Sequence, residues 1–142
     1  MRISEAHVGR TYPPTEPYLI SREKIAEFAG ALGDKNAAYV GSAAMAPPTF
    51  AAVLSMRAWE SLFADPELDV ALSRTIHGDQ KFRWDRPLSV GDQVTSVLTI
   101  AGVRPRGAAA IISVEVELRV GTERVGSASS TLFHTWPEEE VA

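Results

Sequence analysis

The apolar and polar positions of the chain follow a helical period in its first half. Residues 21–33 predict a short helix whose apolar positions fall on one face: Ile25, Phe28, Ala29 and Leu32. Ser21 is placed to cap the first turn of this helix, and Gly33 is placed to end it in the left-handed conformation. The prolines and glycine of residues 1–17 favour an extended lead-in, and residues 18–20 predict a short strand before the helix.

A second helix is predicted after a loop of small and polar residues at positions 34–46. Pro47 and Pro48 are tolerated in a first helical turn, Thr49 is able to cap it, and Asp65 with the proline behind it ends the helix. The helix is apolar on nearly every side, so we expect other elements to surround it. Its apolar residues are Phe50, Ala51, Ala52, Val53, Leu54, Met56, Ala58, Trp59, Leu62 and Phe63.

In the second half of the chain the period changes to two, which predicts strands. The alternation covers residues 76–85, 93–102, 110–120 and 123–135. Turn-forming residues separate these segments at 87–92, 105–107 and 121–122. The short connections predict four antiparallel strands in a meander.

Together these elements predict one α+β domain over residues 1–142, with a solvated acidic tail from about residue 137. An antiparallel sheet wrapped around a long apolar central helix would bury both the helix and the inner face of the sheet. This arrangement is the hotdog fold, in which a sheet edge or face usually pairs with a second copy.

The composition excludes several classes of protein. The chain has 142 residues, 14 Lys and Arg, 18 Asp and Glu, and a formal charge of −4, which argues against a nucleic-acid partner. It has no cysteine, and therefore no disulfide, thiolate nucleophile or iron–sulfur cluster. The start of the chain does not resemble a signal peptide and no segment is long enough to cross a bilayer. We therefore expect a cytoplasmic protein with no membrane partner.

Common site motifs are absent from the sequence. It has no phosphate-binding loop, no Gly-x-Gly-x-x-Gly turn and no Gly-x-Ser-x-Gly elbow. The three histidines, His7, His77 and His134, are too scattered to predict a metal site. We expect no metal and no cofactor.

The segment that follows the first helix resembles the motif of the MaoC-like, (R)-specific enoyl hydratase family. That motif reads Gly-Asp-x-Asn-Pro-(aliphatic)-His, and Gly33, Asp34 and Asn36 match it. Ala37 replaces the proline, and Tyr39 stands in the position of the catalytic histidine. The resemblance makes Asp34 a catalytic candidate, and Asn36 and Tyr39 candidates for substrate binding. Alternatively, Asp34 and Asn36 only close the loop behind the helix.

The exchange of histidine for tyrosine removes the expected base. Tyrosine titrates near 10 and histidine near 6.5, a difference of about 3.5 units, or roughly 5 kcal/mol of proton affinity. Neighbouring residues in the sequence offer no cation to lower the pKa of Tyr39.

Two further segments resemble the same family. At the start of the central helix the family usually has a His-Gly pair, whose glycine N–H receives the thioester oxyanion; here Pro48, Thr49 and Phe50 are the substrate-binding candidates. If Pro48 takes the glycine position the donor is lost, whereas Thr49 would keep one. Alternatively, the two prolines only pre-set a helical turn. On the predicted strand 76–85, His77 and Asp79 are expected on one face, as a base with its orienting partner or as a wet or interface surface.

Several short segments occur in an order and spacing typical of one branch of this family: Val8-Gly9-Arg10, Tyr12-Pro13-Pro14, Arg22-Glu23-Lys24-Ile25, Asp34, Ala46-Pro47-Pro48-Thr49-Phe50 and His77-Gly78-Asp79-Gln80-Lys81-Phe82. Over about residues 1–135 the chain thereby resembles the HadA-type subunit of actinobacterial (3R)-hydroxyacyl-ACP dehydratases, described as a FAS1-like dehydratase domain. The resemblance implies reversible loss of water from a (3R)-3-hydroxyacyl thioester, acyl-ACP or acyl-CoA, without metal or redox cofactor. It also implies a HadB-type partner that carries the catalytic Asp and His, while this chain stabilises the fold and lines the acyl tail. The isolated chain would then have little activity, and a homodimer is possible in isolation.

Three alternatives remain open at this point. A homodimer could keep the chemistry in this chain, with Asp34 or the His77 and Asp79 pair as base. A hotdog acyl-CoA thioesterase could use Asp34 to activate water. A non-catalytic acyl-binding module would need no dehydratase partner.

Overall fold

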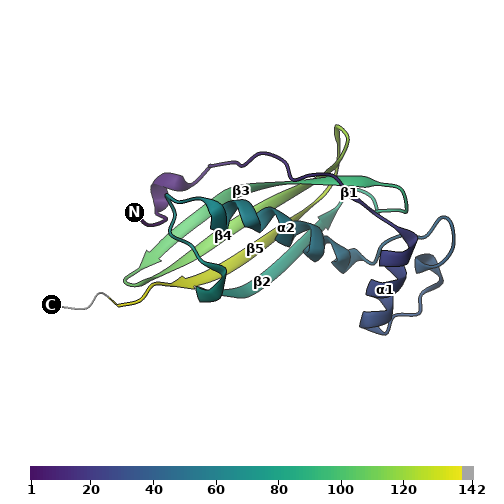
Figure 1. Ribbon diagram of the computed structural model, residues 1–142, viewed down its shortest axis with the longest axis horizontal. Coiled ribbons are helices and arrows are strands. Elements are labelled where there is room, and N and C mark those ends of the chain that lie inside the picture. Colours follow the sequence, from purple (N-terminus) through teal and green to yellow (C-terminus); the bar gives the residue numbers. More distant parts are fainter. Residues whose placement is uncertain (139–142) are drawn as a thin grey trace.

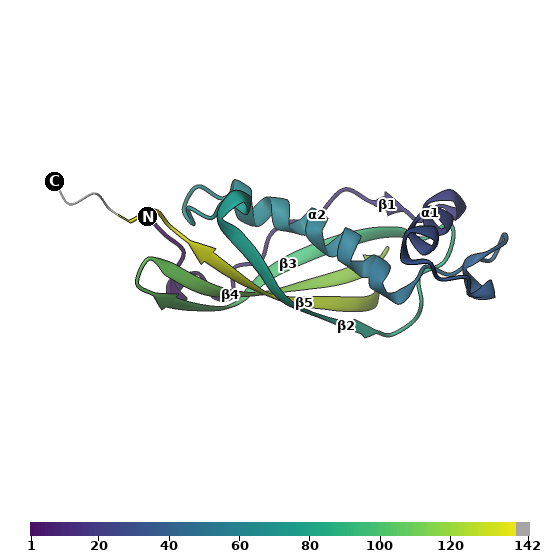
Figure 2. The same ribbon diagram turned by 90° about the horizontal axis from the view of Figure 1, so that it is seen from below.

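The computed structural model describes residues 1–138, and a curved antiparallel sheet with one long helix across its face dominates it (Figures 1 and 2). The strands are β1 Tyr18–Leu19, β2 Thr75–Trp84, β3 Gln93–Arg106, β4 Ala109–Val120 and β5 Glu123–Thr135. The helices are α1 Arg22–Leu32 and α2 Ala51–Ala64, and single 3₁₀ turns include η2 Ala37–Tyr39 and η3 Pro48–Phe50. The predicted α+β hotdog fold is confirmed. The expected acidic tail is exposed at Pro137 and Glu138, and the rest of it lies outside the described residues.

The two helices begin differently. Ser21 caps α1 as predicted, because its hydroxyl accepts the Lys24 N–H at 3.1 Å. Gly33 ends α1 at φ 68°, in the left-handed region that favours glycine. At the second helix Thr49 lies inside η3 and makes no side-chain cap, so the prolines alone set the first turn.

The predicted meander is correct for β3, β4 and β5 but wrong for β2. The strand order is β1-β3-β4-β5-β2, so β2 pairs with β5 at the far edge of the sheet. Residues 85–92 cross the end of the sheet, where Asp85 N–H bonds to β5 and Gly91 N–H bonds to Ile20. Eight residues reach about 26 Å, enough to pass the two intervening strands at ~4.8 Å spacing. Strand β3 also runs beyond its predicted end, through Pro105 and Arg106, so the hairpin turns later.

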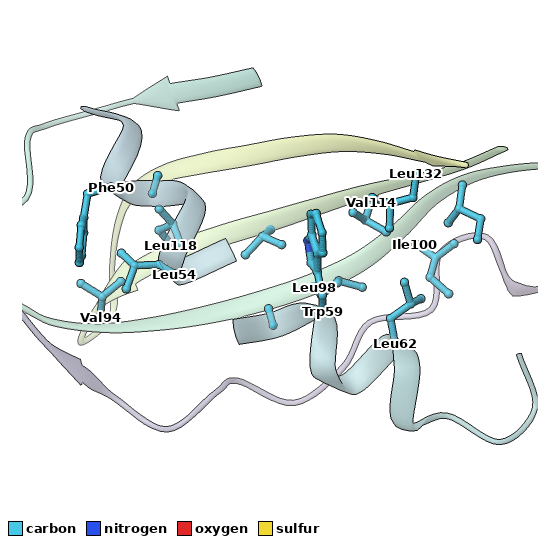
Figure 3. Close-up of a cluster of buried hydrophobic side chains, with 14 of the residues drawn as sticks. Phe50, Leu54, Trp59, Leu62, Val94, Leu98, Ile100, Val114, Leu118 and Leu132 are labelled. Atoms are coloured by element: carbon cyan, nitrogen blue, oxygen red, sulfur yellow. The ribbon is translucent and has the colours of Figure 1, made fainter. Parts of the chain in front are cut away.

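The core lies between α2 and the inner face of the sheet. Figure 3 shows side chains of α2 and η3 directed against those of β3, β4 and β5. The fully or nearly buried members include Phe50, Leu54, Trp59, Leu62, Val94, Leu98, Ile100, Val114, Leu118 and Leu132.

The expectation that α2 is surrounded is wrong for the single chain. The sheet covers one face of the helix, while Arg57 and Glu60 are exposed and the side chain of Met56 is 49% exposed. Within residues 1–138 the outer face of α2 is therefore only partly covered: Arg57 packs over the Tyr18 ring, and Met56 stays half exposed.

The two edges of the sheet differ. Residues 9–15 run along β3, where the N–H groups of Gly9, Tyr12 and Thr15 donate to carbonyls of that strand, and β1 continues the cover. On the other side, no strand within the described part of the chain pairs with the outer edge of β2. One long edge of the sheet is therefore open.

Candidate functional site

The motif behind α1 forms a tight polar loop. The Asp34 carboxylate accepts the Asn36 N–H at 3.1 Å, and the Asn36 side chain accepts the Ala38 N–H at 2.9 Å and so caps η2. These bonds fit the alternative in which Asp34 and Asn36 close the loop. They also fix where Tyr39 stands, because η2 ends with it.

Asp34, Asn36 and Tyr39 line one hollow of about 330 Å³ beside α1. Arg22 and Lys35 bring positive charge to its rim, so the expectation that no cation lies near Tyr39 is wrong. Partial burial, followed by the nearby Asp34 carboxylate, raises the pKa of Tyr39 above its ordinary value of 10.0. At neutral pH the phenol therefore keeps its proton and is able to donate a hydrogen bond but not to accept a proton.

All three histidines of the chain lie within the described residues, and each is engaged elsewhere. His7 Nδ1 accepts the Ser4 N–H at 3.0 Å, and His134 Nε2 accepts the Ala71 N–H at 3.0 Å. His77 contacts Gln80. No imidazole therefore stands beside Asp34 to complete the dyad.

The start of the central helix forms a second hollow of about 330 Å³, separate from the first. Pro48 lines it together with Trp84, Arg86 and Leu88. Thr49 is exposed, and its N–H meets no acceptor within residues 1–138, so it remains a free donor at a helix N-terminus.

Phe50 is fully buried. Its ring packs edge-on against Phe28, with ring centres 5.1 Å apart, and near Tyr18 at 6.0 Å. Phe50 therefore packs in the core and lines neither of the two hollows.

The expectation that His77 and Asp79 share a face is wrong. The pairing of β2 with β5 shifts between these two residues, which makes Gly78 a β-bulge. His77 lies on the inner face against Trp59, with ring centres 4.9 Å apart, while Asp79 faces outward and accepts the Thr131 N–H at 3.0 Å. They do not form a base and its orienting partner.

A side-chain network on the inner face was not foreseen from the sequence. The Gln80 amide donates to the carbonyls of Lys81 and Ser129, so its oxygen accepts from the Ser130 hydroxyl at 2.6 Å and from His77 Nε2 at 3.1 Å. The bulge brings His77 and Gln80 to the same face of the sheet. In the sequence, the only feature that indicates this bulge is an isolated glycine inside a strand pattern. A Cβ on Gly78 would lie 2.1 Å from the Phe133 ring, which explains the glycine.

The described residues contain neither a metal site nor a membrane-spanning helix. No three ligand-type side chains among residues 1–138 converge as a metal site would require. In the same part of the chain, no helix has the length and apolar character needed to span a membrane.

Comparison with solved structures defines the class of fold. The chain superposes on a chain of the HadBC (3R-hydroxyacyl-ACP dehydratase) complex of Mycobacterium tuberculosis with a TM-score of 0.78 and 24% identity, covering 89% of this chain and 96% of that one. A MaoC-like dehydratase gives a TM-score of 0.81 at 23% identity, covering 92% of this chain and 43% of that one. The ChsH1-ChsH2 complex of M. tuberculosis gives 0.68 at 15% identity, with 94% and 87% covered. The fold is that of the MaoC-like hotdog dehydratases.

Comparison of sequences defines the family. The model of the FAS1-like dehydratase domain region matches residues 6–125, and the chain belongs to this family. A UPF0336 protein of Cutibacterium acnes is 56% identical over 139 residues, covering 97% of this chain and 98% of that one. A UPF0336 protein of Streptomyces avermitilis is 39% identical over 127 residues, covering 83% and 85%.

Proposed function

We propose that this chain is the HadA-type subunit of a (3R)-3-hydroxyacyl thioester dehydratase and pairs with a HadB-type hotdog chain that carries the catalytic Asp and His. The observation that carries the proposal is the incomplete dyad: Tyr39 stands beside Asp34, its phenol pKa is raised, and all three imidazoles lie elsewhere. In the reaction, a base takes a proton from C2, the C3 hydroxyl leaves as water after protonation, and a C2–C3 double bond forms. This chain lacks the base.

The surfaces left open support a partner of the same fold. Among residues 1–138 no strand pairs with the outer edge of β2, and Met56 is exposed on the outer face of α2, so a second hotdog chain would extend the sheet and cover this helix. Two of the matched chains with this fold come from the HadBC complex and the ChsH1-ChsH2 complex. In the proposed heteromer, the acyl tail would lie along the outer face of α2 and the hollow that Pro48 lines.

Activity of the purified chain alone and with its partner tests this function. The probe is a (3R)-3-hydroxyacyl-CoA, and the partner is a co-expressed MaoC-like chain from the same genome with the complete Gly-Asp-x-Asn-Pro-x-His motif. We expect no dehydration by this chain alone, and dehydration by the co-purified pair. Asp34→Asn in this chain should change kcat of the pair by less than about twofold, since it supplies no base.

Other outcomes would identify the alternatives. Dehydration at ordinary enzymic rates by the isolated chain, lost in Asp34→Asn, would overturn the proposal in favour of a self-sufficient homodimer. Release of free thiol from acyl-CoA would indicate a thioesterase. Failure to co-purify with any chain carrying the complete motif would leave a non-catalytic acyl-binding module and would contradict the proposal.

A further inference from the structure

The hollow at the start of α2 is built by two segments that the chain holds together. Residues 46–48 lead into the helix, and residues 84–88 form the end of β2 and the turn behind it. The Ala46 N–H donates to the Leu88 carbonyl at 2.8 Å, and both of these side chains are buried. Because the two segments are hydrogen-bonded to each other, the hollow is already formed in the single chain.

The charged side chains at this hollow are engaged with other charges. The Arg86 guanidinium donates to the Asp92 carboxylate at 2.9 Å and to the Glu123 carboxylate at 3.1 Å. Asp85 lies 3.8 Å from Arg124. Since Arg86 already has two carboxylate partners, it offers little attraction to an anionic ligand. The surface left for a ligand is the apolar part of the lining: Ala46, Pro48, Trp84, Pro87 and Leu88.

Trp84 is the largest side chain of this lining, and its ring packs against Gly126, which it faces across the ladder. A Cβ on Gly126 would lie 3.0 Å from Cε3 of the ring and 2.6 Å from the Arg83 carbonyl oxygen, so the glycine makes room for the ring. The indole N–H of Trp84 is buried and meets no acceptor within residues 1–138. Packing, and not a hydrogen bond, therefore holds the ring in place.

The size and polarity of the hollow fit a short apolar chain with a polar head. Its volume of about 330 Å³ is at the lower end of the ~300–1,000 Å³ found for small-molecule sites. Thr49, with its free N–H, directly follows Pro48, so a donor lies next to the apolar lining. A thioester carbonyl at this donor with its acyl chain in the hollow matches the arrangement. The Trp84 ring takes more space from such a chain than any other lining side chain.

We propose that Trp84 determines the length of the acyl chain that the enzyme accepts, and that the unmodified hollow favours short chains. This inference rests on the proposed dehydratase function and adds the residue that sets its chain-length specificity. One methylene in a hydrophobic pocket changes specificity by ~10–200-fold. Replacing an indole ring by a smaller side chain should therefore alter the preference measurably.

Two substitutions with opposite effects on the hollow test the proposal in the pair formed with the partner subunit. Trp84→Leu enlarges the hollow and removes no hydrogen bond within residues 1–138, whereas Ala46→Val makes the hollow smaller. The measurement is the ratio of kcat/KM for a long (3R)-3-hydroxyacyl-CoA, about ten carbons, to that for the four-carbon substrate. We expect this ratio to rise at least about tenfold in Trp84→Leu and to fall several-fold in Ala46→Val.

A second tryptophan provides the matched control. Trp136 is buried behind β5 and lines neither hollow, so Trp136→Leu should leave the ratio unchanged. If Trp84→Leu fails to fold or to pair, Trp84→Phe makes a smaller change of the same sign, and Ala46→Val tests the opposite sign.

Binding measurements separate this inference from the proposed function. Saturated acyl-CoAs have no hydroxyl to lose, so their Kd values, measured by calorimetry on the pair and on the chain alone, report on the hollow without catalysis. A pair that does not dehydrate but shows the shifted binding preference would contradict the dehydratase function and support the role of Trp84.

Three results would overturn the inference. The first is an unchanged length preference in the folded Trp84 and Ala46 variants, in both kcat/KM and Kd. The second is a preference of the unmodified protein for the longer chain. The third is acyl-CoA affinity that does not depend on chain length.

Discussion

His134 shows how a single buried residue links this fold to pH. Its imidazole is fully buried on the inner face of β5, with the Trp136 ring 4.6 Å away. Nε2 accepts the Ala71 N–H, which fixes the proton of the neutral ring on Nδ1, and Nδ1 meets no partner within residues 1–138. Burial, and then the positive charge of Arg74, lowers its pKa below the ordinary 6.5.

We predict that stability falls as the pH drops below about 6.5, because the unfolded chain then takes up a proton that folded His134 resists. The slope from this residue can reach about 1.4 kcal/mol per pH unit. His134→Gln keeps an acceptor for Ala71 and should flatten the dependence. Urea unfolding of both proteins between about pH 5 and pH 7.5 measures this. Parallel pH profiles would show that His134 is not responsible.

At the scale of elements, the positions of α2 and β2 determine which surfaces of the chain remain exposed. The sequence of α2 is apolar around most of its circumference, but the single sheet covers only one side of it. The sequence therefore predicted the helix and not its exposure, because the position of the sheet relative to the helix is not encoded in the helix's own pattern. Similarly, the alternation of residues 76–85 predicted a strand, but one bulged residue, Gly78, moved His77 and Asp79 to opposite faces.

Two substitutions on α2 should separate its covered side from its open side. Leu54 is fully buried, so Leu54→Ala should lower the unfolding free energy of the isolated chain by about 2–5 kcal/mol. Met56 is half exposed, so Met56→Ala should cost less than about 1 kcal/mol. Chemical unfolding checks both values. Equal losses would mean that α2 is covered on both sides even without a partner.

At the scale of the whole molecule, the N-terminal segment holds one edge of the sheet closed. Asp65, at the end of α2, accepts from Arg10 at 2.7 Å and from the Tyr12 hydroxyl at 2.6 Å, while Arg10 also reaches Glu67 at 2.6 Å. The Tyr12 hydroxyl, then Arg10, holds the pKa of Asp65 below its ordinary value against the opposing effect of burial. This cluster fastens the segment that covers β3 to the helix on the other layer.

Removing the shared acceptor should loosen the segment. We predict that Asp65→Ala lowers the melting temperature by about 3–6 °C, because two side chains lose their partner together. Glu67→Gln removes only an exposed contact with Arg10 and should change the melting temperature by less than about 2 °C. Differential scanning calorimetry compares the two. If both variants melt alike, Asp65 does not anchor the segment.

The sequence by itself determined the local elements and the phenol at position 39, where the family motif has a histidine. The periodicity, the capping residues Ser21 and Gly33, and the prolines are local signals that can be recognised in the sequence. The phenol at position 39 follows directly from the amino acid at that position. Only the tertiary structure decided that β2 lies beyond β5 and which faces His77 and Asp79 occupy. It also decided that one sheet edge and one side of α2 stay open. Strand order, a one-residue bulge and surface exposure arise from contacts between segments far apart in the chain, which no local pattern encodes.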